Sequence, residues 1–352
     1  PAEVDIGHMG ADLIEEVARL SGYDNFETAR PLAAINPVYV SPKQASIRKI
    51  REALRHSGCS EAINYSFIEE ALSESFKTAC GKADNSTISL NNPISAEMKT
   101  MRTSVIPGLL ETAVRNLSKG QKPVKVFELG NVYYKEPDGK KITERTNLAI
   151  LVTGPNENDV WKAHSKIYDF YDLKGMLETI LVRFKLQVEY RRTQRDFLAP
   201  GKAIEFFAGE CVVGYMGELA PQQVRQWDLG QSACVLEMDI ERLVQALPPV
   251  VKFAQIPKFP ETYRDISILI DKSAPSREVA ELIQSTGAPL LGKVEIYDCF
   301  ESKKLEAGKR SLAFALAFHS PEKTLTDDEV NPVFDKIVKA LGDKYGASLR
   351  TV

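Results

Sequence analysis

Three carboxylates near the start of the chain have the spacing of a metal site. Asp12, Glu15 and Glu16 fall at i, i+3 and i+4 in a stretch whose apolar residues predict a short helix over 12–22. This spacing stacks the carboxylates over one turn, where their oxygens could hold a hard cation such as Mg²⁺. Alternatively, acidic side chains in a first turn only complement the helix dipole. Spacing alone leaves both interpretations open.

Other catalytic motifs are missing from the sequence. It contains no GxxxxGK[ST] loop and no GxGxxG, and no serine or cysteine lies beside a plausible base. The histidines, which share no pattern, are His8, His56, His164 and His319. The cysteines, which form no CxxC pair, are Cys59, Cys80, Cys211, Cys234 and Cys299. We therefore predict no catalytic residue, no zinc site and no disulfide framework, and we interpret the cysteines as reduced thiols.

The composition is ordinary for a globular chain. Its 352 residues allow two or three domains with their own cores, and 26% of them are charged. No run of about 18 apolar residues occurs, so we predict no membrane span and a cytoplasmic location. The net charge of −3 indicates that any contact with nucleic acid must be local.

Residues 41–247 are predicted to form a core on an antiparallel sheet. Its clearest stretch is Ser89 to Tyr134, where Pro107 begins a helix, Gly120 ends it, and VKVFELGNVYY predicts a buried central strand. Further helices are predicted from 41 to 58 and from 173 to 184, and further strands at 62–67, 146–152, 203–207, 211–219 and 233–238. Strands outnumber helices and hairpin-length connections are common, which favours an α+β fold.

After a linker at 248–257, the residues 258–352 predict a smaller module. Alternating apolar residues predict strands at 266–270, from 294 and at 312–318, and helical spacing predicts helices at 279–283 and 333–341. With a short last strand near Ser348, the order is βαββαβ, which is ferredoxin-like. Thr326 and Glu329 predict a capping box, and Pro332 predicts a kink or a later helix start.

Several motifs resemble the β subunit of bacterial phenylalanyl-tRNA synthetase. In chain order they are ADLIEEVARLSGYDN, NNPIS, MRTS with PGLL, VFELGNVY, RDISILID, SLAFALAF, TLTDDEV and GASLR. Such β subunits are much longer, so the resemblance implies a C-terminal fragment. Residues 1–40 would then be the tail of a preceding module with a linker, 41–247 a class II catalytic-like core, and 258–352 a ferredoxin-like anticodon-binding domain. We interpret Pro1 and Gly7-His8-Met9 as signs of a cut and tagged sequence.

The resemblance implies that Asp12, Glu15 and Glu16 belong to a Mg²⁺ site shared with the α subunit. The family has another aspartate six residues before the first of these positions. This chain has Ile6 there, and Asp5 is one position out of register. The predicted metal site is therefore incomplete in this sequence.

The resemblance also implies a core that has lost its catalytic charges. A class II core carries an arginine on its second-motif strand and another on a glycine-rich third motif, because ATP phosphates need bidentate positive charge. Aligning KVFE on Glu128 puts Val126 at the first of these positions, and Gly214 and Gly217 do not complete a GxGxGxxR pattern. We expect a non-catalytic scaffold for the catalytic α subunit in a complex of two α and two β chains. That complex would use ATP to charge tRNA(Phe), with no ATP bound to this fragment.

The terminal domain is predicted to bind the anticodon region of tRNA. On its third strand Ser311, Ala313, Ala315 and Ala317 alternate with larger apolar residues and leave a flat outer face that a base or backbone could approach. The predicted RNA-binding residues around it are Arg264, Lys293, Tyr297, Lys303, Lys304, Lys309, Arg310 and Arg350. Alternatively, another domain covers this face.

Two other functions stay open from the sequence. The chain could be an active single-chain phenylalanyl-tRNA synthetase, in which a true class II core joins the same terminal domain. It could also be a free RNA-binding scaffold without a synthetase partner. ATP–pyrophosphate exchange by the chain alone tests the first possibility, and co-purification of an α subunit tests the second.

Overall fold

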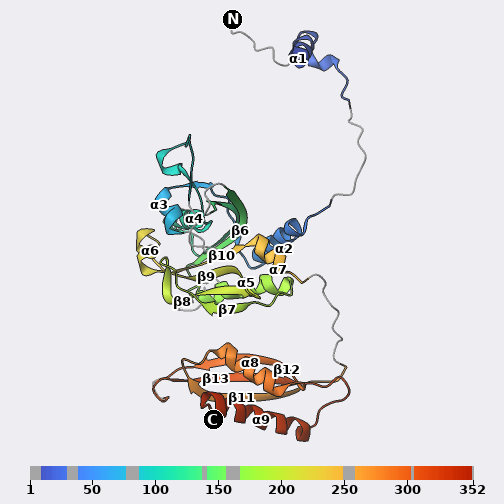
Figure 1. The fold of residues 1–352 in the computed structure, drawn as a ribbon, viewed down its shortest axis with the longest axis vertical. Helices are drawn as coiled ribbons and strands as arrows, with labels where there is room; N and C mark the ends of the chain where they lie inside the picture. The colour runs from blue at the N-terminus through green and yellow to red at the C-terminus, as the bar shows by residue number, and fades with distance from the viewer. Residues whose placement is uncertain are drawn as a thin grey trace. The chain divides into compact units, whose positions relative to one another are not determined.

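The computed structural model describes residues 9–29, 39–76, 87–136, 141–155, 167–248, 258–302 and 305–350. The chain divides into two compact units, an N-terminal unit over Pro1–Val251 and a C-terminal unit over Lys252–Val352 (Figure 1). The division falls within the predicted linker at 248–257, most of which lies outside the described residues. Among the helices that the structure describes, none is long and apolar enough to cross a membrane.

A seven-stranded sheet organises the described part of the N-terminal unit. Across the sheet its strands are β1 (Ser60–Glu61), β5 (Val124–Lys135), β6 (Ile142–Thr153), β10 (Ala233–Asp239), β9 (Cys211–Leu219), β8 (Leu198–Ala208) and β7 (Glu189–Arg192). Neighbours are antiparallel except β1 and β5, which are parallel. The predicted antiparallel α+β core is confirmed.

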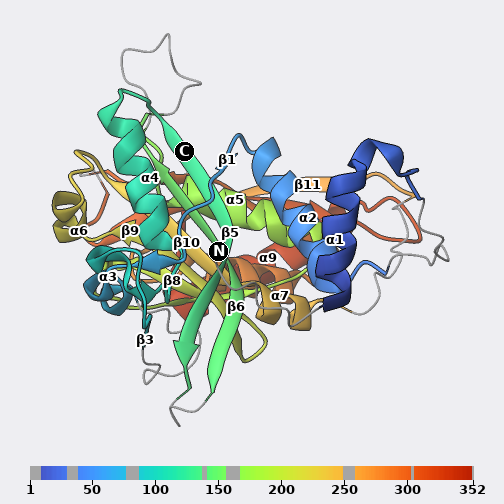
Figure 2. The same cartoon turned by 90° about the horizontal axis from the view of Figure 1, so that it is seen from above.

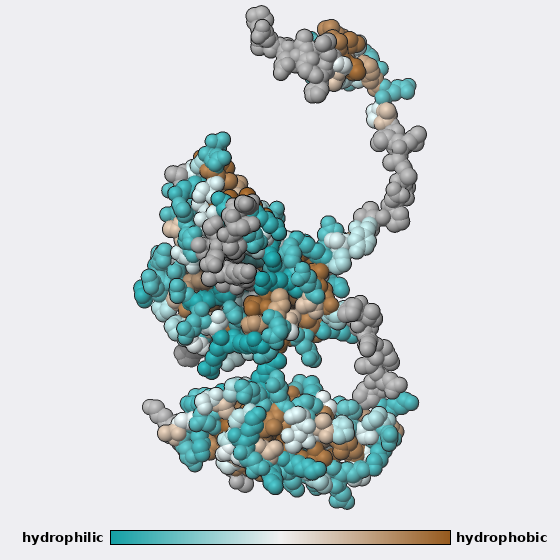
Figure 3. All heavy atoms as spheres, viewed as in Figure 1, coloured by the Kyte–Doolittle hydropathy of each residue, from teal (hydrophilic) through white to brown (hydrophobic). Residues whose placement is uncertain are grey.

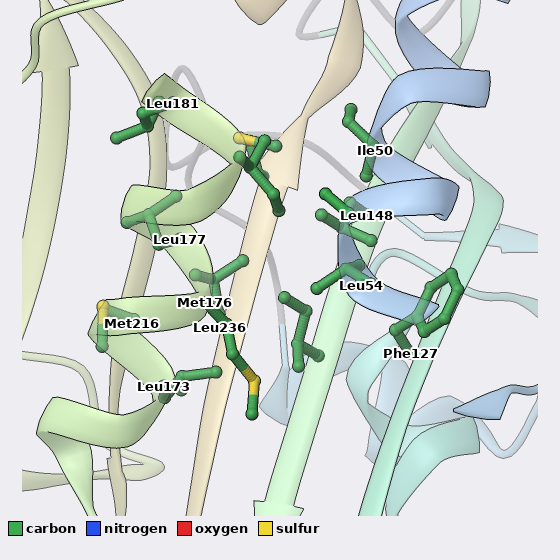
Figure 4. Packing of buried hydrophobic residues seen from close by; sticks show 14 of the residues in the cluster. Ile50, Leu54, Phe127, Leu148, Leu173, Met176, Leu177, Leu181, Met216 and Leu236 are labelled. Atoms are coloured by element: carbon green, nitrogen blue, oxygen red, sulfur yellow. The ribbon is translucent and has the colours of Figure 1, made fainter. Parts of the chain in front are cut away.

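Helices cover both faces of this sheet (Figure 2). One face packs against α2 (Pro42–His56), α5 (Phe170–Arg183) and α7 (Ile240–Ala246). Figure 4 shows Leu173 of α5 and Leu54 of α2 packed with Leu148 and Leu236 of the sheet. The other face packs against α4 (Ile106–Ser118) and α6 (Pro221–Gln226). These two apolar layers bury most of the sheet and hold it rigidly.

Shorter elements complete the N-terminal unit. A small sheet has the order β2 (Phe67–Ile68), β4 (Thr100–Met101) and β3 (Ile88–Ser89), with α3 (Glu70–Ser75) and the 3₁₀ turn η2 (Ala96–Met98) nearby in the chain. Helix α1 (Met9–Ser21) and the 3₁₀ turn η1 (Tyr23–Asn25) precede the core. Figure 3 shows hydrophobic side chains at the surface of α1, where Leu13, Ile14, Val17 and Leu20 are each more than 60% exposed.

Two strand predictions for the core were wrong in detail. No strand covers 62–66, because β1 ends at Glu61 and β2 begins only at Phe67. In between, a side-chain oxygen of Glu128 accepts the backbone N–H of Asn64 at 3.3 Å in place of a strand partner. Strand β5 is second from the sheet edge and not central. It is buried on both faces, and burial on both faces gives a strand the same apolar composition wherever it lies in the sheet.

The C-terminal unit has the predicted βαββαβ order. Its elements are β11 (Thr262–Asp271), α8 (Ser276–Gly287), β12 (Leu291–Phe300), β13 (Lys309–Phe318), α9 (Asp327–Tyr345) and β14 (Ser348–Leu349). The strands lie in the order β12-β13-β11-β14, and both helices pack on one face through Ile266, Phe314 and their neighbours. The capping box of Thr326 and Glu329 is present. Helix α9 therefore starts before Pro332, so a later start was wrong.

Candidate functional site

A buried ion pair lies where the segment after β4 meets β5. Nη1 of Arg102 donates to Oε1 of Glu128 at 2.8 Å, and each side chain is only 3% exposed. Nε of Arg102 donates to the carbonyl of Asn131 at 2.9 Å, and the side-chain amide of Asn64 donates to Oε2 of Glu128 at 2.7 Å. The pair joins three segments of the core, and Glu128 neutralises a charge that would otherwise be free for a phosphate.

Gly130 makes room for this ion pair. A Cβ atom at that position would lie 2.1 Å from Nη2 of Arg102 and 2.9 Å from Oε1 of Glu128, both far too close for contact. The glycine of the FELG motif is thus required by the approach of the guanidinium group to the strand. Together the MRTS and FELG motifs specify one structural contact.

A second buried carboxylate fastens helix α4 to the sheet. Glu237 of β10 is fully buried. Its Oε2 accepts hydrogen bonds from the hydroxyl groups of Ser104 and Tyr215, both at 2.7 Å. Its Oε1 accepts from the backbone N–H of Val105 and the side-chain amide of Asn147, both at 3.0 Å. Because four donors from three segments converge on it, Glu237 fixes where α4 begins.

Apolar packing fills the sheet face on which α4 lies. Val126, at the position predicted to replace a catalytic arginine, belongs to the buried cluster between α4 and the sheet. Arg195 lies against the same face, with its guanidinium carbon 3.9 Å from the ring centroid of Tyr215 and its Nη2 donating to Glu205 at 2.9 Å. Arg102 and Arg195 thus each have a carboxylate partner within the chain. Paired guanidinium groups of this kind hold a fold together.

The two buried thiols of the core are poor nucleophiles. Burial raises the pKa of Cys59 to about 11 and that of Cys234 to about 12. Both thiols therefore stay protonated at neutral pH, and the thiolate is the reactive form of cysteine. Cys211 and Cys299 are free and exposed, and Cys80 lies outside the described residues.

The three predicted metal ligands lie on helix α1. Nη2 of Arg19 donates to Oε2 of Glu16 at 2.6 Å, and this hydrogen bond lowers the pKa of Glu16. In the part of the chain that the structure describes, no three or more His, Cys, Asp or Glu side chains are grouped so that they could hold a metal ion. Asp12, Glu15 and Glu16 therefore do not form a complete site by themselves.

The outer face of the C-terminal sheet carries the small residues predicted for it. Register places Ala317 between Tyr263 and Lys293, and Ala315 between Asp265 and Glu295. The side chains of these partners share the face that the helices do not cover. The row of Asp265, Ala315 and Glu295 at the middle of this face is therefore acidic, and the basic side chains lie toward its ends.

Two predicted RNA-binding arginines lie on the helix side of this sheet. Arg264 donates to Asp327 and, at 3.5 Å, to Asn331, both in the first turns of α9. Arg310 donates through Nη2 to the carbonyl of Ala274 at 2.8 Å. The structure does not bring these two side chains to the outer face, because alternation along β11 and β13 points them toward the helices.

The other predicted RNA-binding residues lie toward the two ends of the outer face or fall outside the described residues. At one end Arg350 places its guanidinium carbon 5.0 Å from the ring centroid of Phe300, and Lys309 pairs with Glu306. At the other end Lys293 pairs with its neighbour Glu295 at 2.6 Å. Tyr297 is 60% exposed at a register shift in β12. Lys303 and Lys304 fall outside the described residues.

Sequence reasoning missed the two buried polar contacts of the core. Glu128 and Glu237 each interrupt an apolar strand, in VKVFELG and in ACVLEMD. A glutamate inside such a run is costly to bury without partners, so it signals a buried network. The sequence gives no sign of which distant residue supplies the partner.

Family models and known proteins match most of this chain in sequence. The family model "Phenylalanyl tRNA synthetase beta chain CLM domain" matches residues 27–240, and "Ferredoxin-fold anticodon binding domain" matches residues 257–350. The phenylalanine–tRNA ligase β subunit of Bacillus licheniformis is 34% identical over 347 residues, which are 96% of this chain and 42% of that protein. The corresponding protein of Bacillus subtilis is 34% identical over 341 residues, again 96% of this chain and 42% of that protein.

A third relative gives the same result. The phenylalanine–tRNA ligase β subunit of Syntrophus aciditrophicus is 32% identical over 349 residues, which are 99% of this chain and 43% of that protein. A pyrrolysyl-tRNA synthetase from Desulfitobacterium hafniense has a TM-score of 0.45 and 16% identity over 60% of this chain and 74% of that chain, a likeness too weak to support an argument. The chain thus spans less than half the length of the relatives it matches. Since the first family model covers more than half of it, the chain belongs to the phenylalanyl-tRNA synthetase β-chain family.

Proposed function

We propose that this chain is a non-catalytic part of phenylalanine–tRNA ligase, which supports a catalytic α subunit and binds the anticodon region of tRNA(Phe). The observation that carries the proposal is the filled sheet face of the core. There Val126 is part of the apolar cluster, and the guanidinium groups of Arg102 and Arg195 are paired with Glu128 and Glu205. A triphosphate would need such charges unpaired and directed into an open cleft.

ATP–pyrophosphate exchange tests the non-catalytic assignment. The purified chain, with phenylalanine, ATP and Mg²⁺, is expected to give no exchange above background, because the guanidinium groups of Arg102 and Arg195 at this sheet face are already paired with carboxylates. The same assay with the α subunit of the same genome added provides the positive control. Exchange by the chain alone at a rate that rises with phenylalanine concentration would overturn the proposal in favour of a single-chain synthetase.

The tRNA contacts of the C-terminal unit are proposed at the ends of its outer face. The acidic residues Asp265 and Glu295 repel phosphates at the middle of the sheet, whereas Lys309 and Arg350 lie toward one end, where Arg350 contacts the exposed ring of Phe300. A lysine and an arginine next to an exposed aromatic ring suit a single-stranded loop, whose bases stack and whose phosphates need cations.

Replacing Lys309 and Arg350 by alanine together is expected to weaken tRNA(Phe) binding roughly tenfold at low salt. The slope of log Kd against log salt concentration should fall by about one unit for each phosphate contact that is lost. Filter binding or fluorescence anisotropy over a salt series measures both quantities. The matched control replaces Lys336 and Lys339, which are exposed on α9, and should change neither. Equal affinity in both double variants would remove Lys309 and Arg350 from the interface.

The remaining parts of the complex are proposed from family membership. We expect a cytoplasmic assembly of two α and two β chains, in which Mg²⁺ is shared between subunits. Asp12, Glu15 and Glu16 would then supply only part of the coordination. Further oxygen ligands would come from groups other than the described residues, because these do not group a complete set.

A further inference from the structure

A cavity of about 280 Å³ opens beside the first turns of helix α4. Its walls come from the segment between β1 and β2, from the start of α3, from η2 and from α4 itself. The packing of α4 against the segment is close, since a Cβ atom on Gly108 would lie 2.7 Å from Cβ of Asn64. This volume lies below the usual range for a small-molecule pocket and is suited to a single inserted side chain.

The cavity is acidic. Glu69, Glu97 and Glu111 line it, and no lysine or arginine is among its lining residues. Burial raises the pKa of Glu111, and the nearby charge of Arg115 only partly offsets this. The described residues supply no hydrogen bond to the Glu111 carboxylate, so a cation that entered would find an acceptor.

Two kinds of occupant are disfavoured by the observed geometry. The described residues form no group of three or more His, Cys, Asp or Glu side chains that could hold a metal ion, so Glu69, Glu97 and Glu111 do not together make a metal site. A nucleic acid would bring phosphates against three carboxylates, which costs free energy at every contact. A basic side chain from a protein remains compatible with both the charge and the size.

Exposed apolar side chains belong to the segments that line the cavity. Tyr65, which lines it, is 68% exposed, and its neighbour Ile63 is 92% exposed. Ile94, which lies just before η2, is 76% exposed. Large apolar side chains with so much exposure, next to a charged recess, are typical of a protein–protein interface with an apolar rim and one deeply inserted anchor.

We propose that this acidic cavity and its apolar rim form a docking surface for a protein partner that inserts one arginine or lysine side chain between Glu97 and Glu111. The inference rests on the proposed function, in which the partner is the α subunit. It adds the location of one contact and the chemistry of the partner's anchor residue. The basic group would pair with carboxylates that lack such a partner within the described chain, and apolar groups flanking it would cover Tyr65 and Ile63.

Charge reversal of the cavity tests this inference in the complex. The variant with Glu97→Lys and Glu111→Lys is expected to bind the α subunit of the same genome on the order of 30-fold more weakly than the unmodified chain, because a desolvated ion pair becomes a repulsion. Isothermal titration calorimetry or surface plasmon resonance measures Kd. A second variant, Tyr65→Ser, keeps the charge and should weaken binding through the apolar rim, roughly tenfold.

The matched control carries the same change of charge elsewhere. Glu178→Lys with Glu210→Lys alters two exposed acids on α5 and in the β8–β9 turn, and Kd should stay within about twofold of the unmodified value. Circular dichroism melting verifies that all variants are folded. If the unmodified chain does not bind the α subunit, the proposed function fails. If it binds and the cavity variant binds equally well, only the docking inference fails.

Discussion

Replacing Arg102 by methionine is expected to lower the free energy of unfolding of the N-terminal unit by about 3–5 kcal/mol. The change removes the cation and leaves the Glu128 carboxylate in a site where its side chain is only 3% exposed. The carboxylate keeps the amide of Asn64 as a donor, but it loses the guanidinium group with which it forms the ion pair. A loss of this size is a large share of a typical domain stability of about 5–15 kcal/mol. Urea denaturation measures it.

Tryptophan fluorescence makes the measurement specific for this unit, because the only tryptophans of the chain are Trp161 and Trp227. The double variant Arg102→Met with Glu128→Leu removes both charges and should recover much of the loss, since apolar replacement of a whole buried pair is often neutral. As a control, Arg191→Met breaks an exposed pair with Glu189 and should cost less than about 1 kcal/mol. If Arg102→Met were as mild as that control, the buried pair would not hold the core together.

The fold could largely be predicted because local patterns and global architecture agree. Alternation in SLAFALAF placed Leu312 and Phe314 toward the helices, and they lie in the core of the C-terminal unit. Ser41-Pro42 and the capping box at Thr326 set the starts of α2 and α9. Each of these signals acts within a few residues, so the sequence contains all of the information needed.

The arrangement of charged side chains could not be predicted in the same way. Arg264 and Arg310 are basic residues near a predicted flat sheet face, yet alternation along their strands directs both to the helix side. Lys293 and Lys309 have acidic neighbours within three residues in the chain, and both form ion pairs with them. The sequence shows which side chains are basic. Whether such a side chain is available to bind RNA depends on the acidic partners that folding brings near it.

The same limit explains why the core contacts were missed. Arg102 and Glu128 are 26 residues apart, and Ser104 and Glu237 are 133 residues apart. An isolated sequence contains no sign of such pairing, although an acidic residue inside an apolar strand does indicate that some partner must exist. The resemblance to the family points out the motifs. The structure shows that MRTS and FELG are in contact, through Arg102 and Glu128.

Replacing Glu237 by leucine is expected to lower the free energy of unfolding of the N-terminal unit by about 4 kcal/mol or more. Four buried donors would lose their acceptor at once, and each unsatisfied buried polar group costs about 1–3 kcal/mol. The donors are the hydroxyls of Ser104 and Tyr215, the backbone N–H of Val105 and the amide of Asn147. The expected readout is a lowered urea midpoint by tryptophan fluorescence, or loss of soluble protein.

Glu237→Gln provides the sharp contrast. Its carbonyl oxygen can replace Oε1 and accept from Val105 and Asn147, while its NH₂ group can replace Oε2 and donate to the two hydroxyl oxygens, which accept as well as donate. The shape is then kept and Val105 and Asn147 keep their acceptor, but the hydroxyl protons of Ser104 and Tyr215 lose theirs. The expected loss is therefore about half of that for leucine, and Tyr215→Phe, which removes one donor, should also cost less than leucine. Were glutamine as damaging as leucine, the negatively charged acceptor that Oε2 offers to the hydroxyls of Ser104 and Tyr215 would be what positions α4, because glutamine keeps the shape of the side chain and the contacts of Oε1.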